Sequence, residues 1–486
     1  MLYFITKSNN VIISKMKKKF IFSIFIMLIT GIFLFGCLPV IKATKIKNKN
    51  IPGADPPKTG HIKINPEGIH KIKHIIIIIQ ENRSFDSYFG TFPGEDGIAM
   101  KNGISTISIF DPLTGEYMHP YPDHYDSNMG GPHGPDAFIT DMDNGKMNGF
   151  IKEGEQASLM EKIWRKFLTF FRKRNISTDV MGYHTDSDIP NYWTYAKNFV
   201  LLDHLFEPIH AGSFPSHLFL MSLWCASSNT PDNPMSFKST LHPIYRTKKN
   251  PEPFGWTDLT YLLHKNHVSW RCYLDGFSVP LVWNVLPGFV DVHQDHQIKN
   301  LVDISHYFNS AKKGTLPSVC WIVPSPADSE HPPALVSVGQ SYVTRIINAA
   351  MKSPDWKSTA IFLTWDDWGG FYDNVVPPEV DKLGYGFRVP GLIISPYTKK
   401  GYIDHQILSF DAYAKFIEDD FCHGERLNPK TDGRPDSRPV VREDIPILGN
   451  LKKDFNFSQK PRRPLVLPVH PKTTLIKTWY DWIYEI

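Results

Sequence analysis

The chain has 486 residues, of which 42% are hydrophobic and 21% charged, and such values are typical of a globular protein with a sizeable core. Its net charge of +4 is unevenly distributed, because residues 1–73 hold 13 Lys/Arg against 2 Asp/Glu and the remaining residues hold 40 against 47. The basic excess belongs to the N-terminal segment. The mildly acidic remainder gives no electrostatic basis for binding nucleic acid.

The N-terminal segment has the pattern of an export signal. Four lysines between positions 15 and 19 precede an apolar run at 20–35, and Gly36 and Cys37 follow. This pattern predicts a signal over 1–37 and an exported protein that is periplasmic, secreted or held at the outer membrane as a lipoprotein. A retained membrane anchor is the alternative, although the run is shorter than the about 20 residues that span a bilayer.

Residues 38–69 are rich in Lys, Pro, Gly and Asn and are interpreted as a linker to a folded body at 70–486. Four cysteines in that body show no metal-binding spacing. In an exported protein they form up to two disulfides or remain buried free thiols, and their spacing does not choose between these. They are Cys225, Cys272, Cys320 and Cys422.

Apolar, β-branched runs alternate with helical patterns along the body. Alternation of this kind predicts an α/β fold with a mostly parallel sheet. The predicted strands are 74–79, 199–202, 268–270, 318–323, 359–364 and 391–394, and the clearest predicted helices are 216–225, 343–352 and 409–420.

Residues 91–190 differ from the rest of the body. They are rich in Gly, Pro, Asp, His and Asn and have few strand runs, so they are interpreted as a loop-rich cap insertion beside the site. The basic, amphipathic stretch 161–174 within them is interpreted as a solvated helix face, with contact to a membrane surface as the alternative.

Polar side chains follow three of the predicted strands. Residues 80–86 follow the first, 324–331 follow the strand that ends at Val323, and 365–370 follow the strand that ends at Thr364. Ligand groups in open parallel sheets gather beyond the carboxyl ends of the strands. We therefore expect the carboxylates, amide and histidine of these segments to lie at one edge of the sheet.

Asp366 and Asp367 are adjacent carboxylates after an apolar strand, and their mutual repulsion costs stability unless a cation compensates it. Together with Glu81 and the Asn82 carbonyl they form an oxygen-rich set that suits a divalent cation. A solvated acidic turn is the alternative. The large apolar side chains of the flanking Trp365 and Trp368 disfavour that alternative.

Ser213 is the candidate nucleophile, since it lies just before an apolar helix whose N-terminus would attract a phosphate. Serine is also a common helix cap, and Ser216 is predicted to be the cap here. The chain has no GxSxG motif around Ser213, which disfavours an acyl-transfer serine hydrolase. Among 20 histidines, His133 in a Gly/Pro-rich stretch and His331 after Glu330 are candidate acids or donors to phosphate oxygens.

At these segments the sequence resembles the bacterial phosphoesterase family that contains non-haemolytic-type phospholipases C and an acid phosphatase branch. The resemblance implies an alkaline-phosphatase-like, three-layer α/β/α sandwich. It also implies a metal held by Glu81, Asn82, Asp366 and Asp367, and such carboxylate ligands allow Zn²⁺, Mn²⁺, Mg²⁺ or Ca²⁺. The segments that carry it are HIIIIIQENRSFDSYFG (74–90), NGKMNGF (144–150), DHLFEPIHAGSFPSHLFLMS (203–222), WNVLPGFVDV (283–292), VPSPADSEHPP (323–333) and TWDDWGGFYDNVVPP (364–378).

The resemblance further implies a nucleophilic hydroxyl at Ser213, histidines that contact phosphate at His133 and His331, and substrate contacts from Asn284 and Glu330. Ser213 resembles the acid phosphatase branch and Asn284 the phospholipases. The expected activity is metal-dependent hydrolysis of phospholipid head groups, with hydrolysis of soluble phosphomonoesters as the alternative.

The sequence disfavours two other classes of protein. A sulfatase would need an oxidisable residue in a CxPxR-type stretch, which the sequence lacks. A non-catalytic envelope-binding protein would be favoured by loss of Glu81, Asp366 or Asp367, and all three are present.

Overall fold

The computed structural model describes residues 67–155, 176–225, 254–276, 279–280, 282–428, 440–478 and 481. The predicted signal, nearly all of the predicted linker and the amphipathic stretch 161–174 lie outside the described residues.

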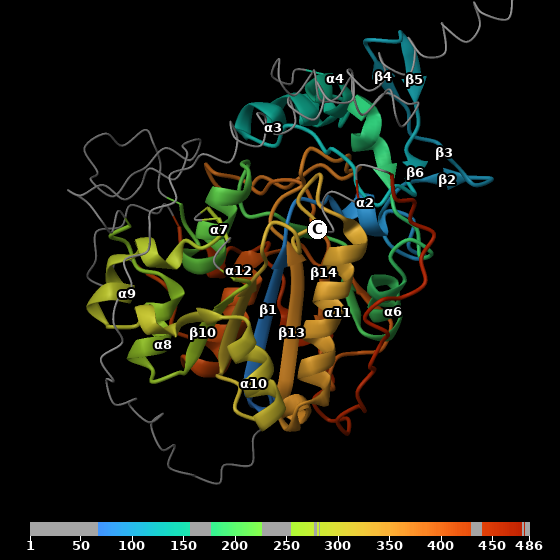
Figure 1. Ribbon diagram of the computed structural model, residues 1–486. Helices are drawn as coiled ribbons and strands as arrows, with labels where there is room; N and C mark the ends of the chain where they lie inside the picture. The colour runs from blue at the N-terminus through green and yellow to red at the C-terminus, as the bar shows by residue number, and fades with distance from the viewer. Residues whose placement is uncertain are drawn as a thin grey trace, which may run out of the picture. The chain divides into compact units, whose positions relative to one another are not determined.

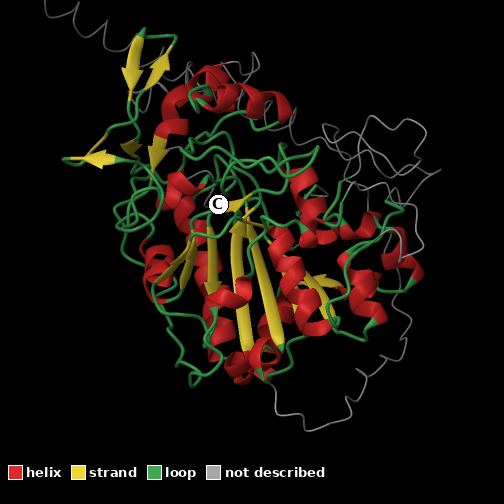
Figure 2. Cartoon of the chain, turned by 180° about the vertical axis from the view of Figure 1, so that it is seen from behind, coloured by secondary structure: helices red, strands yellow, loops and turns green. Residues whose placement is uncertain are grey.

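An eight-stranded sheet forms the centre of the fold (Figures 1 and 2). Its order is β11-β10-β12-β1-β13-β14-β8-β15, and neighbouring strands are parallel except for the two pairs that involve β14. The predicted mostly parallel sheet is therefore confirmed. The strands are β1 (His74–Gln80), β8 (Val200–Leu202), β10 (Trp270–Leu274), β11 (Leu301–Asp303), β12 (Val319–Val323), β13 (Thr359–Trp365), β14 (Gly391–Ile394) and β15 (Tyr402–Asp404).

Helices cover both faces of this sheet. In Figure 1, α10 and α11 lie in front of β1 and β13, and Figure 2, the view from behind, shows helices on the opposite face of the sheet. The predicted three-layer α/β/α arrangement is therefore confirmed. The helices are α2 (Phe85–Phe89), α3 (Pro135–Met142), α4 (Phe150–Glu155), α6 (Pro190–Asn198), α7 (Ser213–Ser222), α8 (Leu259–Lys265), α9 (Val290–Gln294), α10 (Ser305–Lys313), α11 (Val336–Lys352) and α12 (Phe410–Phe421).

The central strand β1 explains why a parallel sheet forms here. Its five consecutive isoleucines, at 75–79, are all at most 1% exposed, because helices cover both faces of the sheet. Ile75 pairs with Val319 of β12 on one side and with Ala360 of β13 on the other. The carboxyl ends of β12, β1 and β13 therefore lie side by side, as the sequence predicts.

The insertion is anchored on the loop that follows β13. Its apolar residues form a second core with Trp368 and Tyr372 of that loop, and Gly131 N donates to Gly369 O at 2.8 Å. A Cβ at Gly370 would lie 2.4 Å from Gly131 Cα, so this close approach of the two backbones requires glycine at 370. The insertion contains α3, α4 and the short strands β2 (Met100–Lys101), β3 (Ile104–Ser105), β4 (Ile109–Asp111), β5 (Glu116–Met118), β6 (Tyr121–Pro122) and β7 (Gly182–Tyr183).

Outside the main sheet, β9 (Leu205–Phe206) pairs with β16 (Leu408–Ser409).

The four cysteines of the body are buried free thiols, so of the two alternatives left open by their spacing, disulfides or free thiols, the second holds. Within the described ranges, no helix is both long enough and apolar enough to cross a membrane.

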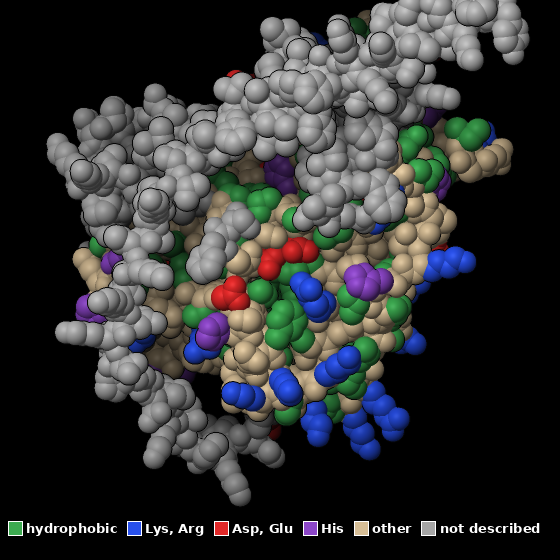
Figure 3. All heavy atoms as spheres, in the orientation of Figure 1, with side chains coloured by type: hydrophobic (Ala, Val, Ile, Leu, Met, Phe, Trp, Pro, Cys, Tyr) green, Lys and Arg blue, Asp and Glu red, His purple; other side chains and the backbone are tan. Residues whose placement is uncertain are grey.

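Figure 3 shows one face of the molecule, in the orientation of Figure 1. On this face, Lys and Arg side chains lie mainly along the lower edge, and acidic side chains lie near the middle.

Candidate functional site

Three side chains that could hold a metal ion meet beyond the carboxyl ends of β1 and β13. Glu81 and Asp366 follow these strands, and His217 lies on α7. His217 Nε2 lies 2.9 Å from Glu81 Oε1 and 3.7 Å from Asp366 Oδ2. One ligand atom from each residue can be chosen so that all three lie within 4.8 Å of one another, and all three residues are buried. This group is called the Glu81 cluster below.

The electrostatics of the Glu81 cluster favour a cation. Burial, reinforced by repulsion from Asp366, raises the pKa of Glu81 well above its usual value, and burial and Asp367 raise the pKa of Asp366. Among the described residues, Glu81 Oε2 and Asp366 Oδ2 are buried and have no hydrogen-bond partner. Burial lowers the pKa of His217 to about 4, which leaves a neutral imidazole suited to metal ligation. The residues therefore fit a divalent cation.

Ser213 lies beside this cluster and contacts two of the predicted ligands. Its hydroxyl donates to Asp367 Oδ2 at 3.0 Å, and it lies 3.4 Å from Asn82 Oδ1. The backbone N–H of Asn82 donates to Asp366 Oδ1 at 2.9 Å, so the segments after β1 and β13 are tied together. Glu81, Asn82, Asp366, Asp367 and Ser213 are thus brought together at one edge of the sheet.

The start of α7 differs from the sequence prediction. The helix begins at Ser213, with Gly212 as its N-cap, so the prediction of Ser216 as the cap is wrong. Ser216 Oγ donates instead to the Asp366 carbonyl at 2.6 Å and fastens the helix to the loop after β13. Ser213 is the first helical residue, where free backbone N–H groups attract anions.

His217 is the residue of the Glu81 cluster that the sequence analysis missed. It lies four residues after Ser213 on the same helix, and residues at that spacing share one face. A search for histidines at i+4 from the predicted nucleophile would have found it.

His133 reaches the site from the insertion. Its Nε2 lies 3.1 Å from Asn82 Nδ2, and its Nδ1 lies 2.8 Å from the Gly131 carbonyl, which requires Nδ1 to carry the proton. A Cβ at Gly212 would lie 3.0 Å from the His133 carbonyl oxygen, so glycine there permits the close approach. His133 and Ser213 are both half-buried, whereas Glu81, Asp366 and Asp367 are at most 1% exposed. The accessible side of the site is therefore formed by Ser213 and His133.

His331 lies on the same side, with its ring centroid 6.3 Å from that of His133. Its Nδ1 lies 2.9 Å from the Pro332 carbonyl, which leaves Nε2 for other partners. Burial, with the nearby His133, lowers its pKa to about 4. The Trp283 ring packs against His331 at 5.9 Å and brings the adjacent Asn284 to this region, where Asn284 Oδ1 is buried with no hydrogen-bond partner among the described residues.

Glu330, a predicted substrate contact, is placed differently. Its side chain is 0% exposed, and its carboxylate accepts hydrogen bonds from Tyr88 (2.6 Å), Tyr192 (2.5 Å) and the Trp365 indole (3.1 Å). Both carboxylate oxygens are therefore occupied inside the protein, which does not support contact with substrate. Glu330 instead holds the backbone that carries His331.

Replacing Glu330 with glutamine is expected to lower the free energy of unfolding by about 1–3 kcal/mol, because one buried donor then faces an amide group instead of a carboxylate oxygen. Denaturant unfolding followed by tryptophan fluorescence measures this change. The control is Glu425→Gln at the exposed Lys265–Glu425 pair, where the loss should stay within about 1 kcal/mol. Equal effects of the two substitutions would contradict the assigned role of Glu330.

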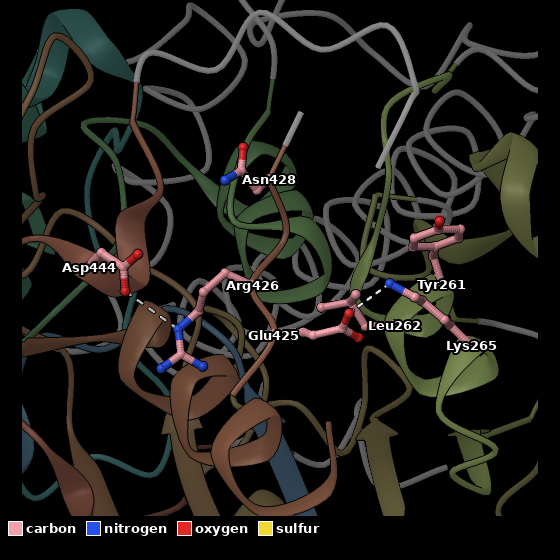
Figure 4. A pocket seen from close by; sticks show the side chains of 7 residues that line it. All are labelled: Tyr261, Leu262, Lys265, Glu425, Arg426, Asn428 and Asp444. Atoms are coloured by element: carbon pink, nitrogen blue, oxygen red, sulfur yellow. Dashed lines mark hydrogen bonds and ion pairs between the residues drawn. The ribbon is translucent and has the colours of Figure 1, made fainter. Parts of the chain in front are cut away.

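A cavity elsewhere on the surface is a poor candidate for the site. It lies between α8 and the segment after α12 and is shown in Figure 4. Its charges are already paired, since Lys265 Nζ lies 2.7 Å from Glu425 and Arg426 Nε lies 3.5 Å from Asp444. It shares no residue with the Glu81 cluster or with Ser213.

The chain is similar in sequence to known phospholipases C. The chain is 26% identical to a non-hemolytic phospholipase C from Burkholderia pseudomallei over 80% of this chain and 60% of that protein. It is 24% identical to phospholipase C B from Mycobacterium tuberculosis over 84% of this chain and 82% of that protein. A solved structure described as an alkaline phosphatase superfamily protein from Vibrio parahaemolyticus is 13% identical, with a TM-score of 0.29, over 48% of this chain and 60% of that one.

The sequence profile of the Phosphoesterase family matches residues 72–422. This range contains every residue predicted for the site, from Glu81 to Asp367. The prediction of a phosphoric ester hydrolase is confirmed at the level of the family. The chain belongs to the Phosphoesterase family.

Proposed function

We propose that this protein is a metal-dependent phospholipase C that cleaves the phosphate ester between diacylglycerol and the phosphorylated head group. The observation that carries the proposal is the position of Ser213. Its hydroxyl begins helix α7, donates to Asp367 and lies beside the Glu81 cluster. A nucleophile, an anion-attracting helix end and a cation site thus converge on one half-buried position, as hydrolysis of a phosphate ester requires.

The metal would be held by Glu81, Asp366 and His217, with Asp367 and Asn82 adjacent. A bound divalent cation would neutralise phosphate charge and favour the ionised form of the serine hydroxyl. Carboxylate and imidazole ligands together suit Zn²⁺, while the oxygen ligands also suit Mn²⁺, Mg²⁺ or Ca²⁺.

The proton of the nucleophile has a direct acceptor. Ser213 Oγ donates to Asp367 Oδ2 at 3.0 Å, and burial raises the pKa of Asp367 to about 7 in the metal-free protein. As Oγ bonds to phosphorus, this proton passes to Asp367 and the bond to the leaving alcohol breaks. The product is a phosphoserine ester. Attack by water then releases the phosphorylated head group and restores the serine hydroxyl.

Two histidines complete the accessible side. Asn82 Nδ2 fixes His133 through Nε2, and the Pro332 carbonyl fixes the ring of His331 through Nδ1. A phosphate anion near His331 favours its protonated form, in which Nε2–H contacts a phosphate oxygen or protonates the leaving alkoxide. The ring of His331 is held by Trp283, and its backbone is held by Glu330.

The phospholipid substrate is supported by the similarity to the two phospholipases C described above. The test is hydrolysis of phosphatidylcholine beside p-nitrophenyl phosphate by the purified full chain, with and without a chelator. Diacylglycerol release that stops on chelation is the expected result. Cleavage of the monoester alone would replace the phospholipase by an acid phosphatase, and loss of both activities with no bound metal would favour an envelope-binding protein.

We also propose that the protein is exported, supported by the basic and apolar N-terminal pattern that ends at Cys37. Cell fractionation with N-terminal sequencing of the mature chain tests this. Recovery of the unprocessed chain in the cytoplasm would contradict it.

A further inference from the structure

A second group of metal-ligating side chains lies at another part of the same sheet edge. Asp203 and His204 directly follow β8, and His405 directly follows β15. These strands are parallel neighbours, with Leu202 opposite Asp404, so their carboxyl ends meet. The three side chains each offer an atom within 4.8 Å of the others. None of them belongs to the Glu81 cluster.

Asp203 is the buried centre of this group. Its side chain is 0% exposed, and its Oδ2 accepts from His405 Nδ1 at 2.7 Å and from Asp96 N at 3.1 Å. Its Oδ1 is buried with no hydrogen-bond partner among the described residues, although it lies 3.5 Å from His204 Nδ1. An unsatisfied, buried carboxylate oxygen that faces an imidazole nitrogen is costly unless a proton on that nitrogen or a bound cation compensates it.

His204 meets oxygen atoms at both ring nitrogens. Nε2 lies 3.1 Å from Asp96 Oδ2, and Nδ1 lies 3.2 Å from the His405 carbonyl and 3.5 Å from Asp203 Oδ1. A neutral imidazole carries one proton, so it cannot donate to both sides. If Nε2 carries the proton and donates to Asp96, the lone pair of Nδ1 faces two acceptors, the His405 carbonyl and the Asp203 carboxylate. A cation at Nδ1 would complete a carboxylate–histidine–metal arrangement, in which the outer carboxylate of Asp96 orients the ligand.

We propose that Asp203, His204 and His405 bind a borderline divalent cation of the zinc type, with Asp96 as the positioning residue for His204. Two imidazoles and a carboxylate form a donor set that Zn²⁺ prefers. His405 is 57% exposed, so solvent can reach the remaining coordination position. The ion would fasten Asp96 and the edge strand β15 to β8.

The test is calorimetric titration of Zn²⁺ into the chelator-treated full chain, with bound zinc counted by elemental analysis. His405→Ala is expected to lose one zinc equivalent relative to the control His306→Ala, which removes an exposed histidine on α10. Asp96→Asn is expected to keep that equivalent and weaken its binding by roughly 10–100-fold. Far-UV circular dichroism checks that each variant is folded, and His405→Gln replaces His405→Ala if the alanine variant is not.

Asp366→Asn separates this proposal from the proposed function. This variant should keep the zinc equivalent that His405→Ala loses, because Asp366 belongs to the Glu81 cluster alone. Equal zinc content in His405→Ala and His306→Ala would overturn the second site. Loss of the same equivalent in Asp366→Asn and His405→Ala would also overturn it, and would assign that zinc to the Glu81 cluster.

Discussion

Replacing Ser213 with alanine is expected to lower kcat for phosphate ester hydrolysis by roughly 10³-fold or more, because no other hydroxyl in the described site occupies its position. Ser213 is half-buried, and its hydroxyl donates to Asp367 and lies 3.4 Å from Asn82 Oδ1, so its removal leaves no large buried group without a partner. The variant should therefore fold normally and keep its metal. Initial-rate kinetics on phosphatidylcholine, with metal content measured in parallel, tests both parts.

The matched control is Ser305→Ala. Ser305 is also the first residue of a helix, α10, but it is exposed and lies outside the site. It should retain the activity of the unaltered protein. Full activity in Ser213→Ala would remove Ser213 from the mechanism and would point to a water nucleophile.

The second large effect is expected from Asp366→Asn. This change removes one of the two carboxylates of the Glu81 cluster, and with it one of the negative charges that would compensate a bound cation. A metal ion contributes several kcal/mol to catalysis, so activity should fall by roughly 10²–10³-fold together with the metal content. Added metal in excess should restore part of the rate, because Glu81 and His217 remain in place.

Asp303→Asn is the control for this experiment. Asp303 ends β11 at the same edge of the sheet, but it is exposed and belongs to neither metal-ligating group. Its substitution should leave the rate and the metal content unchanged. Normal activity of Asp366→Asn after exhaustive chelation would exclude the Glu81 cluster as the catalytic metal site.

Much of the site follows from the sequence because parallel strands place their carboxyl ends together. The isoleucine run at 75–79 could be read as a buried strand, so the residues after it, Glu81 and Asn82, were correctly expected to lie near Asp366 and Asp367. That expectation needed only the direction of the strands and no knowledge of side-chain packing.

The misplaced residues depend on tertiary contacts that a pattern does not contain. Glu330 and His331 are adjacent in the sequence, yet the first is turned into the interior by Tyr88 and Tyr192 while the second is on the accessible side. The sequence predicts the start of α7 three residues too late, because by residue type Ser216 is at least as suitable a helix cap as Gly212. His405 joins His204 only because β15 pairs with β8, a pairing between short strands far apart in the sequence.

The most direct test of the catalytic account is detection of the covalent intermediate. The full chain is mixed with phosphatidylcholine, quenched in acid within the first turnover, digested and analysed by mass spectrometry. The account predicts a phosphocholine adduct on Ser213 that is absent from Ser213→Ala and disappears when substrate is exhausted. An adduct on another residue would contradict the account. So would turnover with no adduct at any quench time, if the Ser213→Ala variant also remains active.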